Sequence, residues 1–267
     1  MSRHAHQQRG FSLIEMLIVV AVLSLVLGAI FNTILDGMKK YRQEENRVNT
    51  TQQSREFLDQ IVRDLHSAGY PGLRMYDPAA IGSGSTAQSN SNVAVGLVAV
   101  SATDLWFEGD IDDSGQVQSI RYTLQANANG HCPCTIMRGS TLKTGGTAPS
   151  SQTVQYNTEL QNVINSTGGA SPYALDGGTI FNGTAVSNNT LYASFKTVPV
   201  FSFYDQNGNA VTVPSDLQGS NLNTGISAVA NVHMISVALN LLSAQEDLQT
   251  HLHSGVSMRA MVKSNNL

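Results

Sequence analysis

The chain has 267 residues, of which 41% are hydrophobic and only 13% are charged, and its formal net charge is -4. This length allows a membrane anchor and one further domain of about 200 residues. The weakly acidic balance, without a basic patch, gives no support to nucleic-acid binding. The sequence holds no P-loop, no H-E-x-x-H pair and no G-x-S-x-G nucleophile motif, so we expect no enzymatic activity and no cofactor.

A short polar leader, residues 1–10, precedes a long apolar run that continues to about Leu35. Met16 to Phe31 holds sixteen residues without a charge, and extension to Leu35 reaches the roughly 20 residues needed to cross a hydrocarbon core. A secretory signal peptide would have a shorter apolar core, of about 7–15 residues, followed by a small-residue cleavage site. The run therefore predicts a transmembrane helix over residues 11–35.

Glu15 lies inside this apolar segment, where an ionised carboxylate costs about 2.5 kcal/mol or more. It either has a partner or lies at the headgroup boundary, where the helix dipole favours an acid near the helix start. The pattern GFSLIE at residues 10–15 resembles the prepilin signal of type IV pilins and pseudopilins. The resemblance implies cleavage after Gly10, N-methylation of Phe11, and an assembly contact between Glu15 and the amino group of Phe11 on the same or a neighbouring subunit.

The resemblance also implies where the chain resides and what it meets. It places the N-terminus in the cytoplasm, a single pass in the bacterial inner membrane, and the C-terminal domain in the periplasm, before uptake into a pilus at the cell surface. The implied partners are prepilin peptidase, other minor pilins, the major pilin, and the inner-membrane assembly platform with its ATPase. Charge alone does not fix this orientation, because basic residues flank the span on both sides: Arg3, Arg9, Lys39, Lys40 and Arg42.

The helix is predicted to continue well beyond the span, because no proline occurs before Pro71. Its soluble part covers residues 36–69, of which 42–56 are nearly all polar and predict a solvated stretch. Apolar residues then return at helical spacing and predict a face that packs on a sheet: Phe57, Leu58, Ile61, Val62 and Leu65. The charged residues between them are expected to stay in solvent: Arg55, Glu56, Asp59, Arg63 and Asp64. Gly69 predicts the C-terminal cap.

Residues 70–267 predict a β-rich domain that begins with a polar loop at 71–92. Strand-like runs occur at Val93–Val100, Asp104–Phe107, Val117–Leu124, Val198–Tyr204, Ile235–Leu241 and Val256–Val262. Between the two groups of strands, residues 139–189 predict a polar insertion. The expected fold is therefore α+β and type IV pilin-like, with a long N-terminal transmembrane helix packed on an antiparallel sheet that carries long loop insertions.

The segment 55–70, REFLDQIVRDLHSAGY, resembles the one that closes the long helix in PilW-type minor pilins. The stretches 110–115, 201–208 and 256–265 are similar to β segments of the same family. The resemblance implies a low-abundance minor pilin that primes type IV pilus assembly at the pilus tip, with a role in motility or cell adhesion. Two alternatives remain open: a J-type minor pseudopilin of type II secretion, and a bitopic membrane-anchored receptor whose insertion binds a ligand.

Asp110, Asp112 and Ser114 match the opening of an EF-hand-like calcium loop. Arg121 occupies the place where such a loop needs a bidentate Glu. A tight turn that joins two strands explains the same residues, because Asp and Gly tolerate its backbone geometry.

One residue separates Cys132 from Cys134, and this pair allows three interpretations. They form a local disulfide in an oxidising periplasm, remain free thiols in a turn, or join the neighbouring His131 in a metal site. His251 and His253 would point the same way in a strand, as a metal needs, or are surface histidines of a polar loop.

Overall fold

The computed structural model describes residues 12–72, 75, 90–126, 132–145, 153–165, 198–212, 229, 231–246 and 253–263. The chain divides into two compact units, Met1–Glu45 and Asn46–Leu267. The predicted leader, residues 1–10, lies outside the described residues, as does Phe11.

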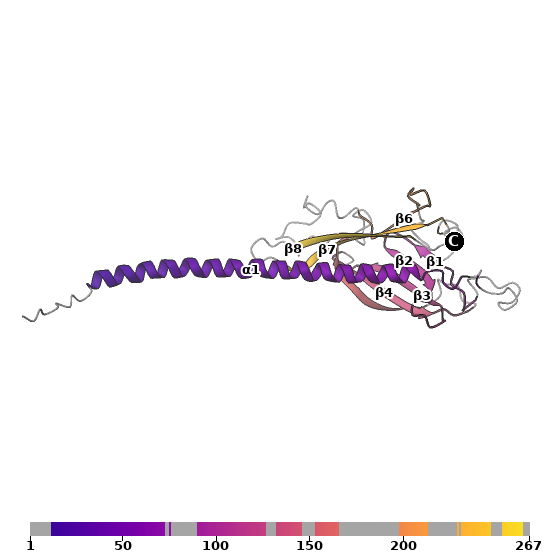
Figure 1. Cartoon of the computed structure of the whole chain (residues 1–267), viewed down its shortest axis with the longest axis horizontal. Coiled ribbons are helices and arrows are strands. Elements are labelled where there is room, and N and C mark those ends of the chain that lie inside the picture. Colours follow the sequence, from indigo (N-terminus) through magenta and orange to yellow (C-terminus); the bar gives the residue numbers. More distant parts are fainter. Residues whose placement is uncertain are drawn as a thin grey trace, which may run out of the picture. The chain divides into compact units, whose positions relative to one another are not determined.

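One helix, α1 (Leu13–His66), confirms the prediction of an unbroken helix (Figure 1). Ser12 begins it, because the Ser12 carbonyl accepts the N–H of Glu15 at 3.0 Å and of Met16 at 3.2 Å. Gly69 ends it with a φ of 79°, the left-handed conformation that glycine adopts at helix C-termini. The Gly69 N–H then donates to the Glu108 carbonyl at 2.8 Å, which ties the end of the helix to the sheet.

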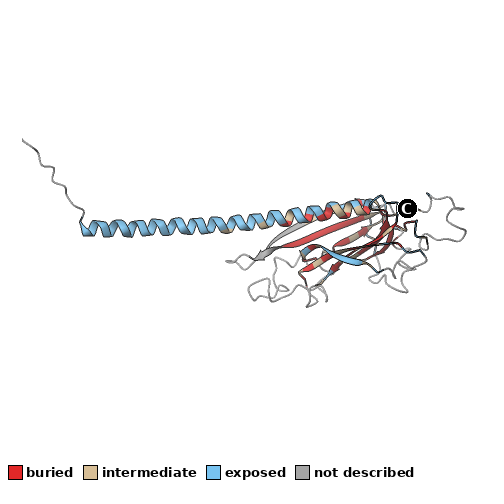
Figure 2. Ribbon diagram, turned by 90° about the horizontal axis from the view of Figure 1, so that it is seen from below, coloured by how far each residue is buried: buried red, intermediate tan, exposed pale blue. Residues whose placement is uncertain are grey.

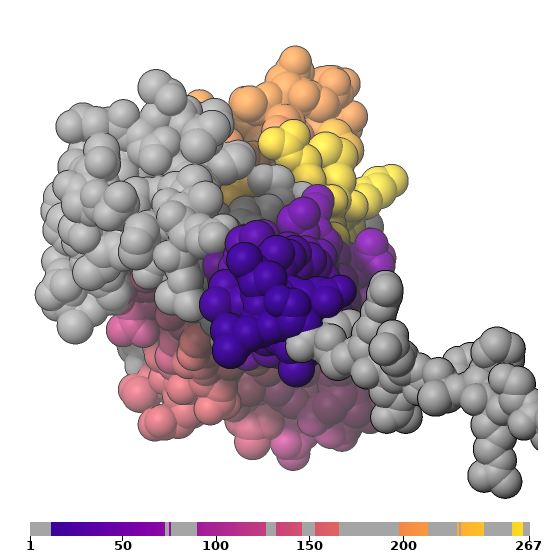
Figure 3. Space-filling view, turned by 90° about the vertical axis from the view of Figure 1, so that its left-hand side faces the viewer, coloured from indigo at the N-terminus to yellow at the C-terminus, as the bar shows by residue number. Residues whose placement is uncertain are grey.

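The C-terminal unit contains an antiparallel sheet of eight strands among the described residues. The strands are β1 (Leu97–Val100), β2 (Asp104–Gly109), β3 (Gln118–Gln125), β4 (Cys134–Leu142), β5 (Gln155–Val163), β6 (Phe201–Tyr204), β7 (Met234–Glu246) and β8 (His253–Lys263). Their order is β1-β2-β3-β4-β5-β7-β6, and β8 pairs with β7. Figure 3 shows the strands of the second half, orange and yellow, gathered on one side of this unit and the pink strands β4 and β5 on the opposite side.

Six strands fall where the sequence predicts them, whereas β4 and β5 do not appear among the predicted runs. The stretch 139–189, predicted as a polar insertion, contains the end of β4 and all of β5. The first four residues of β5 are exposed and polar or aromatic, and only Leu160 and Val163 of this strand are buried, so it lacks a clear apolar alternation. Most of the rest of 139–189 lies outside the described residues.

Burial separates the two parts of the helix, as Figure 2 shows in pale blue and red. The apolar residues predicted to face a sheet do so, and Ile61 and Leu65 are no more than 1% exposed. The buried face begins earlier than predicted, because Thr50 and Ser54 are also buried. Each hydroxyl donates to the carbonyl four residues earlier, at 2.8 Å for Thr50 and 2.6 Å for Ser54, so these small polar residues pack without an unpaired donor.

Candidate functional site

The N-terminal end of α1 carries the residues expected to act in processing and assembly. Glu15 lies in the first turn of the helix, three residues after Ser12, and its side chain is exposed. An acid at this place interacts favourably with the N-terminal end of the helix dipole. Gly10 and Phe11, the predicted cleavage and methylation residues, lie outside the described residues.

Apolar side chains cover the part of α1 that follows Glu15, and they are exposed all round the helix. Leu17 is 64% exposed and Leu25 is 76% exposed. An 18-residue window of this helix has a mean hydropathy of 2.8, so by length and composition it can cross a membrane. A continuous apolar surface of this size needs lipid or other apolar helices around it.

The C-terminal end of α1 is fixed to the sheet by a polar cluster of Asp64, Tyr122 and Arg138. The Tyr122 hydroxyl donates to Asp64 Oδ2 at 2.6 Å, and Arg138 Nε donates to the same oxygen at 2.8 Å. The prediction that Asp64 stays in solvent is therefore wrong, since its side chain is only 12% exposed. The charge pattern on the helix could not reveal this, because both partners come from β3 and β4, far along the chain.

Tyr122 is buried at the centre of this cluster, between helix and sheet. Its ring makes an edge-to-face contact with Phe57 of α1 and stacks on Phe107 of β2. Burial raises the pKa of the Tyr122 phenol, and the neighbouring Asp64 carboxylate raises it further. The hydroxyl therefore stays protonated and serves as a donor to Asp64.

A second buried ion pair lies where the sheet meets the loop before β1. Lys143 Nζ contacts Glu108 Oε2, and both side chains are fully buried. Lys143 also donates to the Val93 carbonyl at 2.8 Å, while the Val95 N–H donates to Glu108 Oε2 at 3.1 Å. Burial raises the pKa of Glu108 even though Lys143 attracts its charged form. The sequence gives no signal for this pair, because its members are 35 residues apart.

Gly109, the residue after Glu108, permits the close approach of β2 to the end of the helix. A Cβ at this position would overlap the carbonyl of Ser67. Ala68 also forms a bridge with Gly109. Glycine is therefore required here by contact rather than by its own backbone conformation.

The calcium-like loop between β2 and β3 is held by hydrogen bonds to its own backbone N–H groups and to the side chain of Gln118. Asp110 accepts the N–H of Ser114 at 3.1 Å and of Gly115 at 2.8 Å, and Asp112 accepts the Gln118 side chain at 2.8 Å. Arg121 binds Asp104 instead of this loop, with Arg121 Nη2 2.8 Å from Asp104 Oδ1. These contacts favour the turn interpretation over the calcium interpretation.

The structure joins Cys132 and Cys134 in a disulfide, the first of the three interpretations. Both residues are buried, and the bond lies at the start of β4. His131 and His251 lie outside the described residues, as does the side chain of His253. Across the described part of the chain, no group of three His, Cys, Asp or Glu side chains has the arrangement of a metal site.

Comparison with known families supports the prepilin interpretation. A model of the prokaryotic N-terminal methylation motif matches residues 5–31, a stretch that includes Gly10, Phe11 and Glu15. Neither the comparison with curated proteins nor the comparison with solved structures finds a match. The motif, together with the α+β architecture, supports a type IV pilin- or pseudopilin-like protein. The signal implies processing by prepilin peptidase and an inner-membrane anchor.

Proposed function

We propose that this chain is a PilW-like minor pilin, a low-abundance subunit that primes type IV pilus assembly and resides at the pilus tip. The main support for this proposal is the methylation motif, which lies at the start of a helix whose far end packs on an antiparallel sheet. The resemblance of residues 55–70 to the PilW helix end supports the pilus role over other pilin-like roles. The protein acts as a structural subunit rather than as an enzyme.

The proposed mechanism assigns separate tasks to the two ends of the helix. Residues 11–35 hold the subunit in the inner membrane with the C-terminal domain in the periplasm. Prepilin peptidase cuts after Gly10 and methylates Phe11, and Glu15 then pairs with a Phe11 amino group. In an apolar helix bundle this pair fixes the axial register, because a displaced subunit would leave a charge without a partner. The partners are the other minor pilins, the major pilin, and the assembly platform with its ATPase.

Deletion of the gene, followed by complementation with the wild-type chain, tests the pilus role. The proposal predicts that surface pili fall in number and that type II secretion continues at its normal rate. Loss of secretion with normal piliation would overturn the proposal and favour the J-type pseudopilin. Normal piliation and normal secretion would favour the membrane-anchored receptor.

A further inference from the structure

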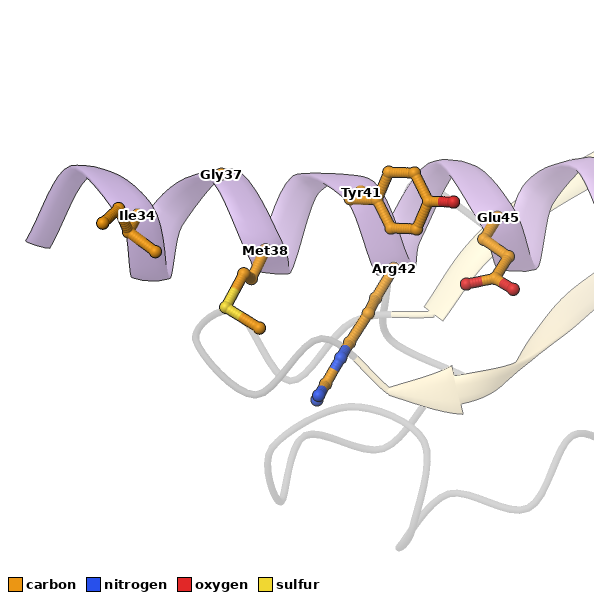
Figure 4. A pocket seen from close by; sticks show the side chains of 6 residues that line it. All are labelled: Ile34, Gly37, Met38, Tyr41, Arg42 and Glu45. Carbon is orange, nitrogen blue, oxygen red and sulfur yellow. The ribbon is translucent and has the colours of Figure 1, made fainter. Parts of the chain in front are cut away.

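A shallow groove follows one face of α1 just beyond the apolar span. Its walls are Ile34, Gly37, Met38, Tyr41, Arg42 and Glu45 (Figure 4). These residues repeat every three or four positions, so they form one stripe of the helix. Gly37 opens the middle of the stripe, because no atom lies within 4 Å of where its Cβ would be.

The order of chemical groups along the groove is apolar, then basic, then acidic. Ile34 and Met38 line the end nearer the span, Arg42 follows, and Glu45 closes the far end. Figure 4 shows Met38 and Arg42 leaving the helix on the same side. A zwitterionic aminophospholipid carries its groups in the same order, since acyl chains come first, then the phosphate, then the amine.

The depth of the groove in a membrane supports this match. The apolar residues from Leu13 to Leu35 cover about 34 Å of helix, close to the hydrocarbon thickness of about 30 Å. Arg42 begins about 10 Å beyond Leu35. Helical side chains lean toward the N-terminus, and arginine extends its charge along an apolar stem, so Arg42 reaches back toward the phosphate layer.

The charges around the groove agree with a zwitterionic ligand better than with an anionic one. Asp36 Oδ1 lies 4.0 Å from Lys39 Nζ, so the charges of these two residues largely cancel. Lys40 and Arg42 add two positive charges, and Glu44 and Glu45 add two negative charges one turn further out. Among the ion pairs of the described residues, none involves Arg42 or Glu45.

We propose that this groove binds the headgroup of an aminophospholipid such as phosphatidylethanolamine, from the leaflet into which the helix emerges. Arg42 binds the phosphate, Glu45 accepts the ammonium N–H groups, and an acyl chain lies over Gly37 between Ile34 and Met38. This contact holds the helix at a fixed depth before the subunit leaves the membrane. The inference rests on membrane anchoring and not on the choice between pilus and secretion system.

Native mass spectrometry of the full chain, released from nanodiscs of equal phosphatidylethanolamine and phosphatidylglycerol, tests the proposal. The wild-type chain should retain phosphatidylethanolamine over phosphatidylglycerol by about two- to five-fold, the scale of an exposed ion pair. Arg42→Gln should remove most retained lipid of both kinds, whereas Glu45→Gln should reverse the preference toward phosphatidylglycerol. Lys40→Gln and Glu44→Gln change the same charges outside the groove and should keep the wild-type preference.

Equal retention of the two lipids by the wild-type chain would overturn the proposal, as would an unchanged preference in Glu45→Gln. A reversal caused equally by Glu44→Gln would also overturn it, because general charge and not the groove would then select the lipid. If Arg42→Gln reduces surface pili in cells while lipid retention stays normal, Arg42 binds a protein partner and the lipid proposal is wrong. Failure of the chain to enter nanodiscs would instead contradict the membrane anchor.

Discussion

Glu15 is the only charged residue between Ser12 and Leu35, and it occupies the first turn of an otherwise apolar helix. A carboxylate in hydrocarbon needs a partner, and the free amino group made by cleavage before Phe11 would supply one. We predict that Glu15→Gln leaves cleavage unchanged and lowers the amount of the subunit in sheared pili by about ten-fold, or ~1.4 kcal/mol. Immunoblots of the pilus and membrane fractions measure this ratio.

Asp36→Asn is the matched control, because it removes an acidic residue of the same helix just outside the apolar run. It should leave the pilus fraction close to the wild-type value. Equal incorporation of Glu15→Gln and wild-type subunits would contradict the assembly role of Glu15.

The buried pair of Glu108 and Lys143 predicts a pH-dependent stability effect. Lys143→Met would leave the Glu108 carboxylate buried without its cation, and at pH 7 we expect the free energy of unfolding to fall by about 3 kcal/mol. Glu108 has a raised pKa in the folded chain, and loss of Lys143 raises it further. The folded chain therefore binds this proton more tightly than the unfolded chain does.

It follows that the contribution of Glu108 to stability is greatest below its unfolded pKa, about 4.5, and declines as the pH rises toward the folded pKa. The loss caused by Lys143→Met should shrink as the pH is lowered toward 4.5. The double variant Glu108→Gln/Lys143→Met should recover much of the loss at pH 7. Urea unfolding followed by the fluorescence of Trp106, the single tryptophan, measures the free energy of unfolding of the wild-type chain, of Lys143→Met and of the double variant. If the loss of stability in Lys143→Met stays constant with pH, Glu108 is not the group whose buried charge destabilises this variant.

At the scale of elements, the end of α1 is held on the sheet by an apolar face as well as by Asp64. Phe57 and Leu65 are 3% and 1% exposed. We predict that Phe57→Asp or Leu65→Asp lowers the free energy of unfolding by at least about 3 kcal/mol, because each removes a core side chain and buries a charge. Arg63→Asp, on the exposed face of the same helix, should change it by no more than about 0.5 kcal/mol. Unchanged unfolding of Leu65→Asp in urea would show that this face does not pack on the sheet.

Sequence periodicity predicts the elements in which large apolar residues recur at a regular spacing. The absence of proline predicts the single helix. Ile235, Val237, Leu239 and Leu241 alternate along β7 with Ser236, Ala238 and Asn240, and both faces of this strand are buried. β5 carries too few buried residues to give such a pattern. Periodicity also fails to predict the contacts of Asp64. Its position on the polar side of the helix gives no sign of Tyr122 and Arg138 across the interface.

At the scale of the whole molecule, the prepilin signal is easier to recognise in the sequence than the contacts of the C-terminal unit. The signal is local, because Gly10, Phe11 and Glu15 lie within a stretch of six residues that continues directly into an apolar run. The disulfide of Cys132 and Cys134 is also local, yet its chemistry leaves three interpretations open until the structure joins the sulfur atoms. The two ion pairs that link helix, loop and sheet depend on contacts between distant segments and require the fold.

The mass of the N-terminus shows directly whether the chain is processed as a prepilin. The full chain is produced in cells with and without prepilin peptidase, purified from membranes, and its N-terminal peptide is identified by mass spectrometry. We predict that the mature chain begins at N-methylated Phe11 only when the peptidase is present. Retention of Met1 in both cells would contradict the pilin-like assignment and favour a membrane-anchored binding protein.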